Sequence, residues 1–189
     1  MKRPKGLLLT PGAGADRNQS CLVALDEALS AKGIVVERMD FPYRIAGRRA
    51  PDRAPVLVSA VRAGAAELAR RAHARPTSLA LGGRSMGGRI CSLAVAEGLR
   101  AAALVLISYP LHPPGKPDQL RTEHFPDIEI PCLFVSGTRD GFGTPDELTK
   151  ATKSIKGPVT HAWVEGGDHG LRRKDQIVLD LVASWLSKV

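Results

Sequence analysis

SLALGGRSMGGRIC, residues 78–91, sets Ser85 between two pairs of glycines directly after a short apolar run. Glycine loses more conformational entropy on folding than any other residue, so glycines this close together need a steric reason. Residues 83–87 match the pattern G-x-S-x-G, in which a serine stands on a sharp turn between a strand and a helix. The flanking glycines then prevent clashes of side chains with the neighbouring strand and helix.

Short apolar runs of β type alternate with helical patterns along the chain, which is typical of β-α-β units and a parallel sheet. The near-continuous apolar runs LVLIS and CLFVS fit strands that helices cover on both faces. We expect about six strands, at Leu7–Thr10, Ile34–Met39, Ser78–Leu81, Ala103–Ser108, Cys132–Ser136 and His161–Val164.

Helical patterns lie between these strands. Leu22, Leu25 and Leu29 form one apolar stripe, and a second stripe begins at Val178. We expect helices at Gln19–Lys32, at about Ala54–Ala74, at Met86–Glu97 and near the end of the chain. The serine therefore lies where a strand is followed by a helix, which is the structural context that G-x-S-x-G requires.

Length and composition suit a single α/β domain spanning residues 1–189, with 43% hydrophobic and 24% charged residues. No apolar run approaches the roughly 18 residues of a membrane span. The opening segment MKRPKGLLLTPG has too short an apolar run for a signal peptide. We therefore expect a cytoplasmic protein that does not associate with membranes.

The formal net charge of +8 raises the question of nucleic-acid binding. Lys and Arg are scattered in short clusters, however, and only 4% of the residues are aromatic, so solvated surface charge is the favoured interpretation. The three cysteines form no C-x-x-C pair, and the histidines show no metal-ligand spacing. We expect reduced cysteines, no metal and no other cofactor.

A serine hydroxyl is a weak nucleophile at neutral pH, so a catalytic Ser85 needs a base and an orienting acid. Asp140, in GTRDGFG, and His169, in GGDHGL, each follow a strand, at the sheet edge where Ser85 also emerges. The other histidines lie in a helix, in a strand or in a loop without a motif. Asp146 and Glu147 are typical of a first helical turn.

The segments GGRSMGG, SGTRDGFG and GGDHGL resemble the small, lidless, dienelactone-hydrolase-like members of the α/β-hydrolase superfamily. The resemblance covers nearly the whole chain, in the family's order of elements. It implies a nucleophile at Ser85, a general base at His169 and an orienting acid at Asp140. It also implies an oxyanion hole with backbone donors at Met86 and at Ala13, although Pro11 stands where the family usually has histidine.

The segment of residues 109–131 contains six prolines and reads as a long ordered loop, of the kind that often lines a site. Arg84, Arg89 and His112 could each carry a surface salt bridge instead of lining a pocket. Of these, we predict that Arg84 and His112 bind substrate and favour an anionic compound.

Together these features predict a serine hydrolase that cleaves an ester, thioester or similar small acyl substrate through an acyl-serine intermediate. The alternative is a catalytically silent hydrolase-fold module within a larger assembly, and the oligomeric state is left open. The complete set of Ser85, Asp140 and His169 favours the enzyme, since a scaffold has no physical need for all three.

Overall fold

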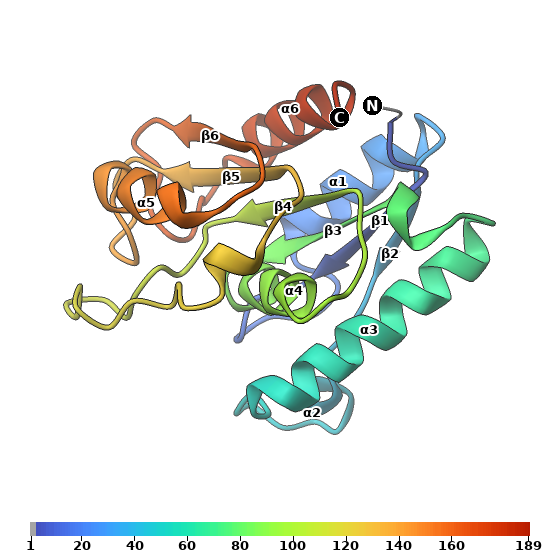
Figure 1. Cartoon of the computed structure of the whole chain (residues 1–189), viewed down its shortest axis with the longest axis horizontal. Coiled ribbons are helices and arrows are strands. Elements are labelled where there is room, and N and C mark those ends of the chain that lie inside the picture. Colours follow the sequence, from blue (N-terminus) through green and yellow to red (C-terminus); the bar gives the residue numbers. More distant parts are fainter. Residues whose placement is uncertain (1–2) are drawn as a thin grey trace.

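The structure is a computed structural model that describes residues 3–189, and its centre is one parallel sheet between two layers of helices (Figure 1). The strands lie side by side in the order β2-β1-β3-β4-β5-β6, and every pairing is parallel. The strands are β1 (Gly6–Thr10), β2 (Val35–Arg38), β3 (Leu79–Arg84), β4 (Ala103–Ile107), β5 (Cys132–Gly137) and β6 (Val159–Val164). The prediction of an α/β parallel sheet of about six strands is confirmed.

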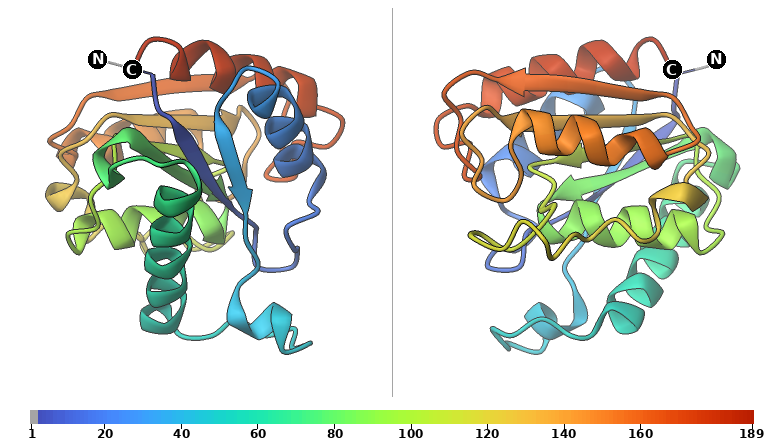
Figure 2. Two further views of the ribbon diagram at one scale, coloured as in Figure 1. Left: turned by 90° about the vertical axis from the view of Figure 1, so that its right-hand side faces the viewer. Right: turned by 60° about the vertical axis from the view of Figure 1, so that its left-hand side comes forward.

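Helices cover both faces of the sheet (Figure 2). They are α1 (Ser20–Ser30), α2 (Pro42–Ile45), α3 (Ala54–Arg71), α4 (Met86–Ala96), α5 (Pro145–Ala151) and α6 (Asp175–Leu186). Successive residues of a strand point to opposite faces, so Leu7 and Leu9 pack with α1 and α6, while Leu8 packs with α3 and α4. The apolar stripes of the sequence therefore face the sheet.

The strand before Ser85 is longer than predicted, because β3 continues through Gly82 and Gly83 to Arg84. Gly83 pairs with Thr10 of β1, and a Cβ built on Gly83 would lie 2.1 Å from the Thr10 hydroxyl oxygen. A Cβ on Gly82 would lie 2.4 Å from the Val105 carbonyl oxygen. These two glycines therefore allow close packing around a strand and are not part of the turn itself.

The proline-rich segment of residues 109–131 is irregular apart from a short 3₁₀ turn at Phe125–Asp127, as expected of a long loop. Buried aromatic side chains anchor this loop to the hydrophobic core. The ring of Tyr109 packs against those of Phe125 and Phe134, with centroids 5.4 and 5.7 Å away. The Tyr109 hydroxyl also donates a hydrogen bond to the Arg121 carbonyl oxygen at 2.8 Å, which folds the loop back on itself.

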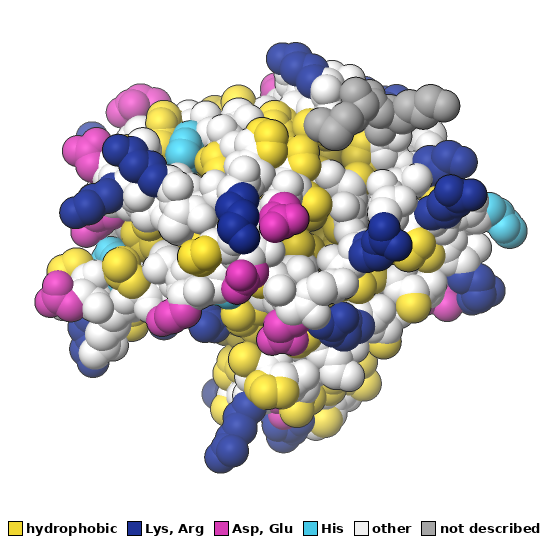
Figure 3. Space-filling view, viewed as in Figure 1, with side chains coloured by type: hydrophobic (Ala, Val, Ile, Leu, Met, Phe, Trp, Pro, Cys, Tyr) yellow, Lys and Arg dark blue, Asp and Glu magenta, His cyan; other side chains and the backbone are white. Residues whose placement is uncertain are grey.

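The four-residue helix α2 was not predicted, because it is too short for a helical stripe. Asp146 and Glu147 lie in the first turn of α5, as predicted. Thr144 and Glu147 form a reciprocal capping box at the start of this helix. Within residues 3–189 no helix has both the length and the apolarity to cross a membrane. On the face shown in Figure 3, Lys and Arg side chains are dispersed among acidic and uncharged ones.

Candidate active site

Ser85 stands on the sharp turn between β3 and α4, with a backbone φ of 51° and ψ of −118°. A positive φ is strained for a residue with a side chain, so the surrounding structure must hold it. The Ser85 N–H donates to the Ile107 carbonyl oxygen at 2.8 Å, and Gly87 lies directly against β1. A Cβ on Gly87 would lie 2.5 Å from the Thr10 carbonyl oxygen and 2.6 Å from that of Pro11. Only glycine lets α4 begin this close to the sheet.

The structure brings the three predicted catalytic residues together. The Ser85 Oγ lies 2.9 Å from the His169 Nε2, and the His169 Nδ1 lies 2.9 and 3.0 Å from the Asp140 Oδ2 and Oδ1. A carboxylate can only accept hydrogen bonds, so Nδ1 carries the proton and Nε2 is left to accept from the Ser85 hydroxyl. This is the tautomer that a general base requires.

Asp140 is almost completely buried, with 2% of its surface exposed. Its Oδ1 also accepts the Phe142 backbone N–H at 2.8 Å, and the Phe142 ring stacks on the His169 ring with centroids 3.9 Å apart. The two loops that carry Asp140 and His169 are joined by a hydrogen bond from the Arg139 N–H to the Gly167 carbonyl oxygen at 2.8 Å. Both the carboxylate and the imidazole are therefore fixed from more than one side.

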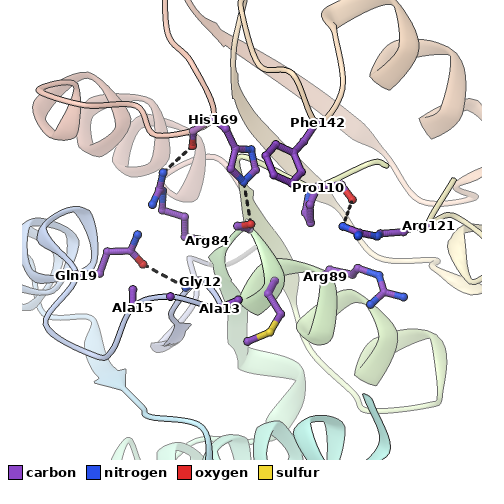
Figure 4. A pocket seen from close by; sticks show the side chains of 13 residues that line it. Gly12, Ala13, Ala15, Gln19, Arg84, Arg89, Pro110, Arg121, Phe142 and His169 are labelled. Carbon is purple, nitrogen blue, oxygen red and sulfur yellow. Dashed lines mark hydrogen bonds between the residues drawn. The ribbon is translucent and has the colours of Figure 1, made fainter. Parts of the chain in front are cut away.

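Ser85 and His169 line a cavity of about 640 Å³ at the carboxyl edge of the sheet (Figure 4). Met86 and Ala13, the predicted oxyanion donors, line the same cavity. Met86 is the first residue of α4, where the backbone N–H has no partner within the helix. Ala13 lies in a loop, and its N–H donates no hydrogen bond to a backbone carbonyl oxygen within residues 3–189.

The loop that carries Ala13 is held by side chains. The Tyr43 hydroxyl donates to the Ala13 carbonyl oxygen at 2.8 Å, and the Gly12 N–H donates to the Gln19 Oε1 at 3.2 Å. Tyr43 is fully buried, so the contact links the loop to the core of the protein. The sequence provided no sign of this contact, because Tyr43 lies on α2, which periodicity does not reveal.

Of the two predicted substrate-binding residues, Arg84 lines the cavity and His112 does not. Arg84 Nη2 donates to the His169 carbonyl oxygen at 2.6 Å. The prediction that His112 lines the pocket is wrong. The residue is 5% exposed and packs from the long loop against α5. Its Nδ1 bonds the Pro113 carbonyl oxygen at 2.8 Å, and its Nε2 lies 3.5 Å from Glu147.

Three further residues of the cavity wall, Arg89, Arg121 and Phe142, were not predicted to line it. The sequence leaves Arg89 open between a surface salt bridge and a pocket, and Arg121 lies within the loop that is expected to border a site. Neither its position nor its neighbours distinguished Arg121 from the other basic residues of that loop.

A second serine and histidine, Ser92 and His124, are also in contact, with Oγ and Nε2 2.7 Å apart. Neither residue lines the cavity, and Ser92 is fully buried. Among residues 3–189 the buried His124 Nδ1 has no hydrogen-bond partner, so no carboxylate there orients the ring. Burial, with a smaller contribution from Arg89, lowers the pKa of His124 to about 4. This pair is a structural contact of α4 with the long loop.

A parallel sheet with a serine on a strand-to-helix turn, followed along the chain by aspartate and histidine on the same edge, defines an α/β hydrolase. In agreement, the sequence model of the family described as "Alpha/beta hydrolase domain" matches residues 3–185. The chain belongs to this family.

Solved structures with the same fold cover nearly the whole chain. An α/β serine hydrolase homologue from Coxiella burnetii is 19% identical, with a TM-score of 0.73 over 98% of this chain and 88% of that one. Dienelactone hydrolase from Anabaena variabilis is 17% identical, with a TM-score of 0.76 over 97% and 85%. Est1E from Butyrivibrio proteoclasticus is 16% identical, with a TM-score of 0.76 over 98% and 87%. At these identities the similarity concerns the fold.

Proposed function

We propose that this protein is a serine hydrolase that cleaves an ester, thioester or similar small acyl compound through an acyl-serine intermediate. The observation that carries the proposal is the continuous chain of hydrogen bonds from the Ser85 Oγ through His169 to Asp140 beside an open cavity. Structural neighbours named as dienelactone hydrolase and as serine hydrolase homologue are consistent with it.

In the first half of the reaction, the His169 Nε2 takes the hydroxyl proton as Ser85 Oγ attacks the acyl carbonyl carbon. Asp140 stays ionised, holds the ring and stabilises the imidazolium that forms. His169 then gives its proton to the leaving alcohol or thiol, and the acyl group remains on Ser85. A water molecule, deprotonated by the same histidine, then attacks the acyl carbonyl. The bond from the acyl carbon to Ser85 Oγ breaks, the histidine returns its proton to Oγ, and the acid is released.

Negative charge develops on the carbonyl oxygen in both tetrahedral intermediates. The backbone N–H groups of Met86 and Ala13 are the proposed donors to this oxygen, since both residues border the cavity beside Ser85. The positive end of the α4 dipole adds to this field, because Met86 is its first residue.

The cavity suits a small substrate, since its volume lies within the roughly 300–1,000 Å³ of typical small-molecule sites. We also propose a cytoplasmic location. The three cysteines are free and buried, as suits a reducing compartment.

A fluorophosphonate probe tests the proposal, because it reacts with an activated serine whatever the natural substrate. We expect wild-type protein to be labelled and Ser85→Ala to remain unlabelled. Ser92→Ala is the matched control, and it should be labelled like wild type because Ser92 lies outside the cavity. A folded wild-type protein that stays unlabelled would favour the silent interaction module.

A further inference from the structure

Three arginines, Arg84, Arg89 and Arg121, border the cavity that contains Ser85, and no acidic residue among residues 3–189 lines it. Within residues 3–189, none of the ion pairs includes any of the three. Asp140, the nearest acid of the site, is already bound to His169. The cavity wall therefore carries a positive charge that the protein itself does not neutralise.

The three guanidinium groups lie on two sides of the cavity. Arg84 lies beside Gln19 and donates to the His169 carbonyl oxygen, so its charge helps to hold the histidine loop (Figure 4). Arg89 and Arg121 lie together across the cavity, next to Pro110 (Figure 4). Arg89 extends from α4 and Arg121 from the long loop, so two separate elements bring them together.

Most of the hydrogen-bonding capacity of Arg89 and Arg121 is unused. Arg121 Nη1 makes one long hydrogen bond, 3.4 Å, to the Pro110 carbonyl oxygen. The Arg89 Nε is buried and has no hydrogen-bond partner in the described part of the chain. A guanidinium has five N–H donors, and a buried donor without an acceptor destabilises the folded protein.

Electrostatics point the same way. Burial first, and then the charge of Arg89, lower the pKa of Arg121. Glu123 is close enough to influence the pKa values of Tyr109 and His124, yet it makes no ion pair with either arginine. Two like charges held together at a cavity wall are unfavourable until an anion lies between them.

We propose that Arg89 and Arg121 form a subsite for an anionic group, so that the substrate is a small acyl compound carrying a carboxylate or a similar anion. The inference rests on the proposed serine hydrolase and specifies its substrate class. Planar guanidinium groups match the two oxygens of a carboxylate, and such charged hydrogen bonds are stronger than neutral ones. The scissile carbonyl then sits at Ser85 while the charged end lies against α4 and the long loop.

Two pairs of esters test this subsite. The two members of a pair are identical except that one carries a free carboxylate and the other carries the methyl ester of that carboxylate. The first pair is 4-nitrophenyl hydrogen glutarate and 4-nitrophenyl methyl glutarate, with the charge on the acyl side. The second is 4-butyryloxybenzoate and its methyl ester, with the charge on the leaving group. The measured quantity is the ratio of kcat/KM for the anionic ester to that for the neutral ester.

We expect wild type to favour the anionic member of at least one pair, and Arg121→Gln and Arg89→Gln to lower that ratio by about tenfold or more. In both variants the kcat/KM for the anionic ester should fall by a larger factor than that for its neutral partner. Arg75→Gln is the matched control, because it removes one positive charge from an exposed residue before β3, at the opposite end of that strand. Its ratio should equal that of wild type.

Calorimetry with glutarate and folded Ser85→Ala protein reports anion binding independently of hydrolysis. Binding that Arg121→Gln abolishes in this background supports the subsite even if no ester is cleaved, in which case the proposed hydrolase alone fails. Equal ratios in wild type and both arginine variants, with Ser85 labelled by the probe, overturn the subsite and leave the hydrolase. Absent hydrolysis together with absent glutarate binding overturns both.

Discussion

Asp140→Asn is the change whose effect on the proposed reaction can be worked out from the structure in most detail. The Asp140 Oδ1 accepts the Phe142 N–H at 2.8 Å, and Oδ2 lies 2.9 Å from the His169 Nδ1. Asparagine has one oxygen, and the Phe142 N–H selects its position. The amide nitrogen then takes the Oδ2 position, 2.9 Å from the His169 Nδ1, where a proton on Nδ1 would face a second donor although the amide oxygen lies 3.0 Å away. The amide therefore donates to Nδ1, and the proton of the ring moves to Nε2. In this tautomer the histidine cannot accept the Ser85 proton.

The opposite amide orientation restores the correct tautomer but sets the amide nitrogen against the Phe142 N–H. A buried donor without an acceptor costs about 1–3 kcal/mol, which disfavours this orientation roughly 5- to 150-fold. The neutral amide also stabilises the imidazolium less than the carboxylate does, by about 1–2 kcal/mol, the difference between charged and neutral hydrogen bonds. The sum is about 2–5 kcal/mol, or a loss of roughly 30- to 5,000-fold in kcat.

The assay is hydrolysis of 4-nitrophenyl acetate, with the rate of fluorophosphonate labelling as a second readout. Thermal unfolding checks that the variant is folded. Asp168→Asn is the matched control, since Asp168 is the exposed acid beside His169 and, within residues 3–189, the ring nitrogens bond to Ser85 and Asp140 instead. A folded Asp140→Asn protein with less than about a fivefold loss, or an equal loss in both variants, would refute the assigned role.

Three further outcomes follow from other contacts. Gly87→Ala should lower the unfolding free energy by about 1–3 kcal/mol or more in urea titrations, since its Cβ would lie 2.5 Å from the Thr10 carbonyl oxygen, and an unchanged midpoint would contradict this reasoning. Tyr43→Phe should lower kcat several-fold with little change in KM, because the hydrogen bond that holds the Ala13 carbonyl is lost, at a cost of about 1 kcal/mol in stability. The pKa of His124 is lowered from 6.5 to about 4, so between these pH values the unfolded chain binds a proton that the folded protein does not. The unfolding free energy is therefore highest above pH 6.5 and falls by up to about 3 kcal/mol as the pH is lowered towards 4. In His124→Gln the unfolding free energy should fall less steeply over this range, and parallel curves for both proteins would contradict the assignment.

The sequence by itself determined the features that depend on residues close together in the chain, such as the turn that carries Ser85. The strand before Ser85, the helix after it and the glycines at the adjoining ends of both are neighbours in the chain, so the turn could be recognised without tertiary information. Asp140 and His169 could be assigned for a related reason. Each follows a strand of a parallel sheet, and parallel strands end on one edge, so the chain order placed both near Ser85 in advance.

Only the tertiary structure decided which side chains border the cavity. His112 and Arg121 lie in the same proline-rich loop, and the prediction favoured His112. The loop folds back, however, with the Arg121 N–H bonded to the Leu111 carbonyl oxygen and the Arg121 carbonyl bonded to the Tyr109 hydroxyl. This path brings Arg121 to the cavity wall and leaves His112 against Glu147.

The physical reason is that these contacts join residues far apart in sequence through a segment without periodic structure. A repeating pattern of apolar residues reports which face of a helix or strand is buried, but it carries no information about the path of an irregular loop. That path depends on which aromatic rings and carbonyl groups the finished core presents to the loop. The proposed catalytic residues can thus be assigned from local sequence, whereas the charge of the cavity wall depends on how the long loop packs against α4.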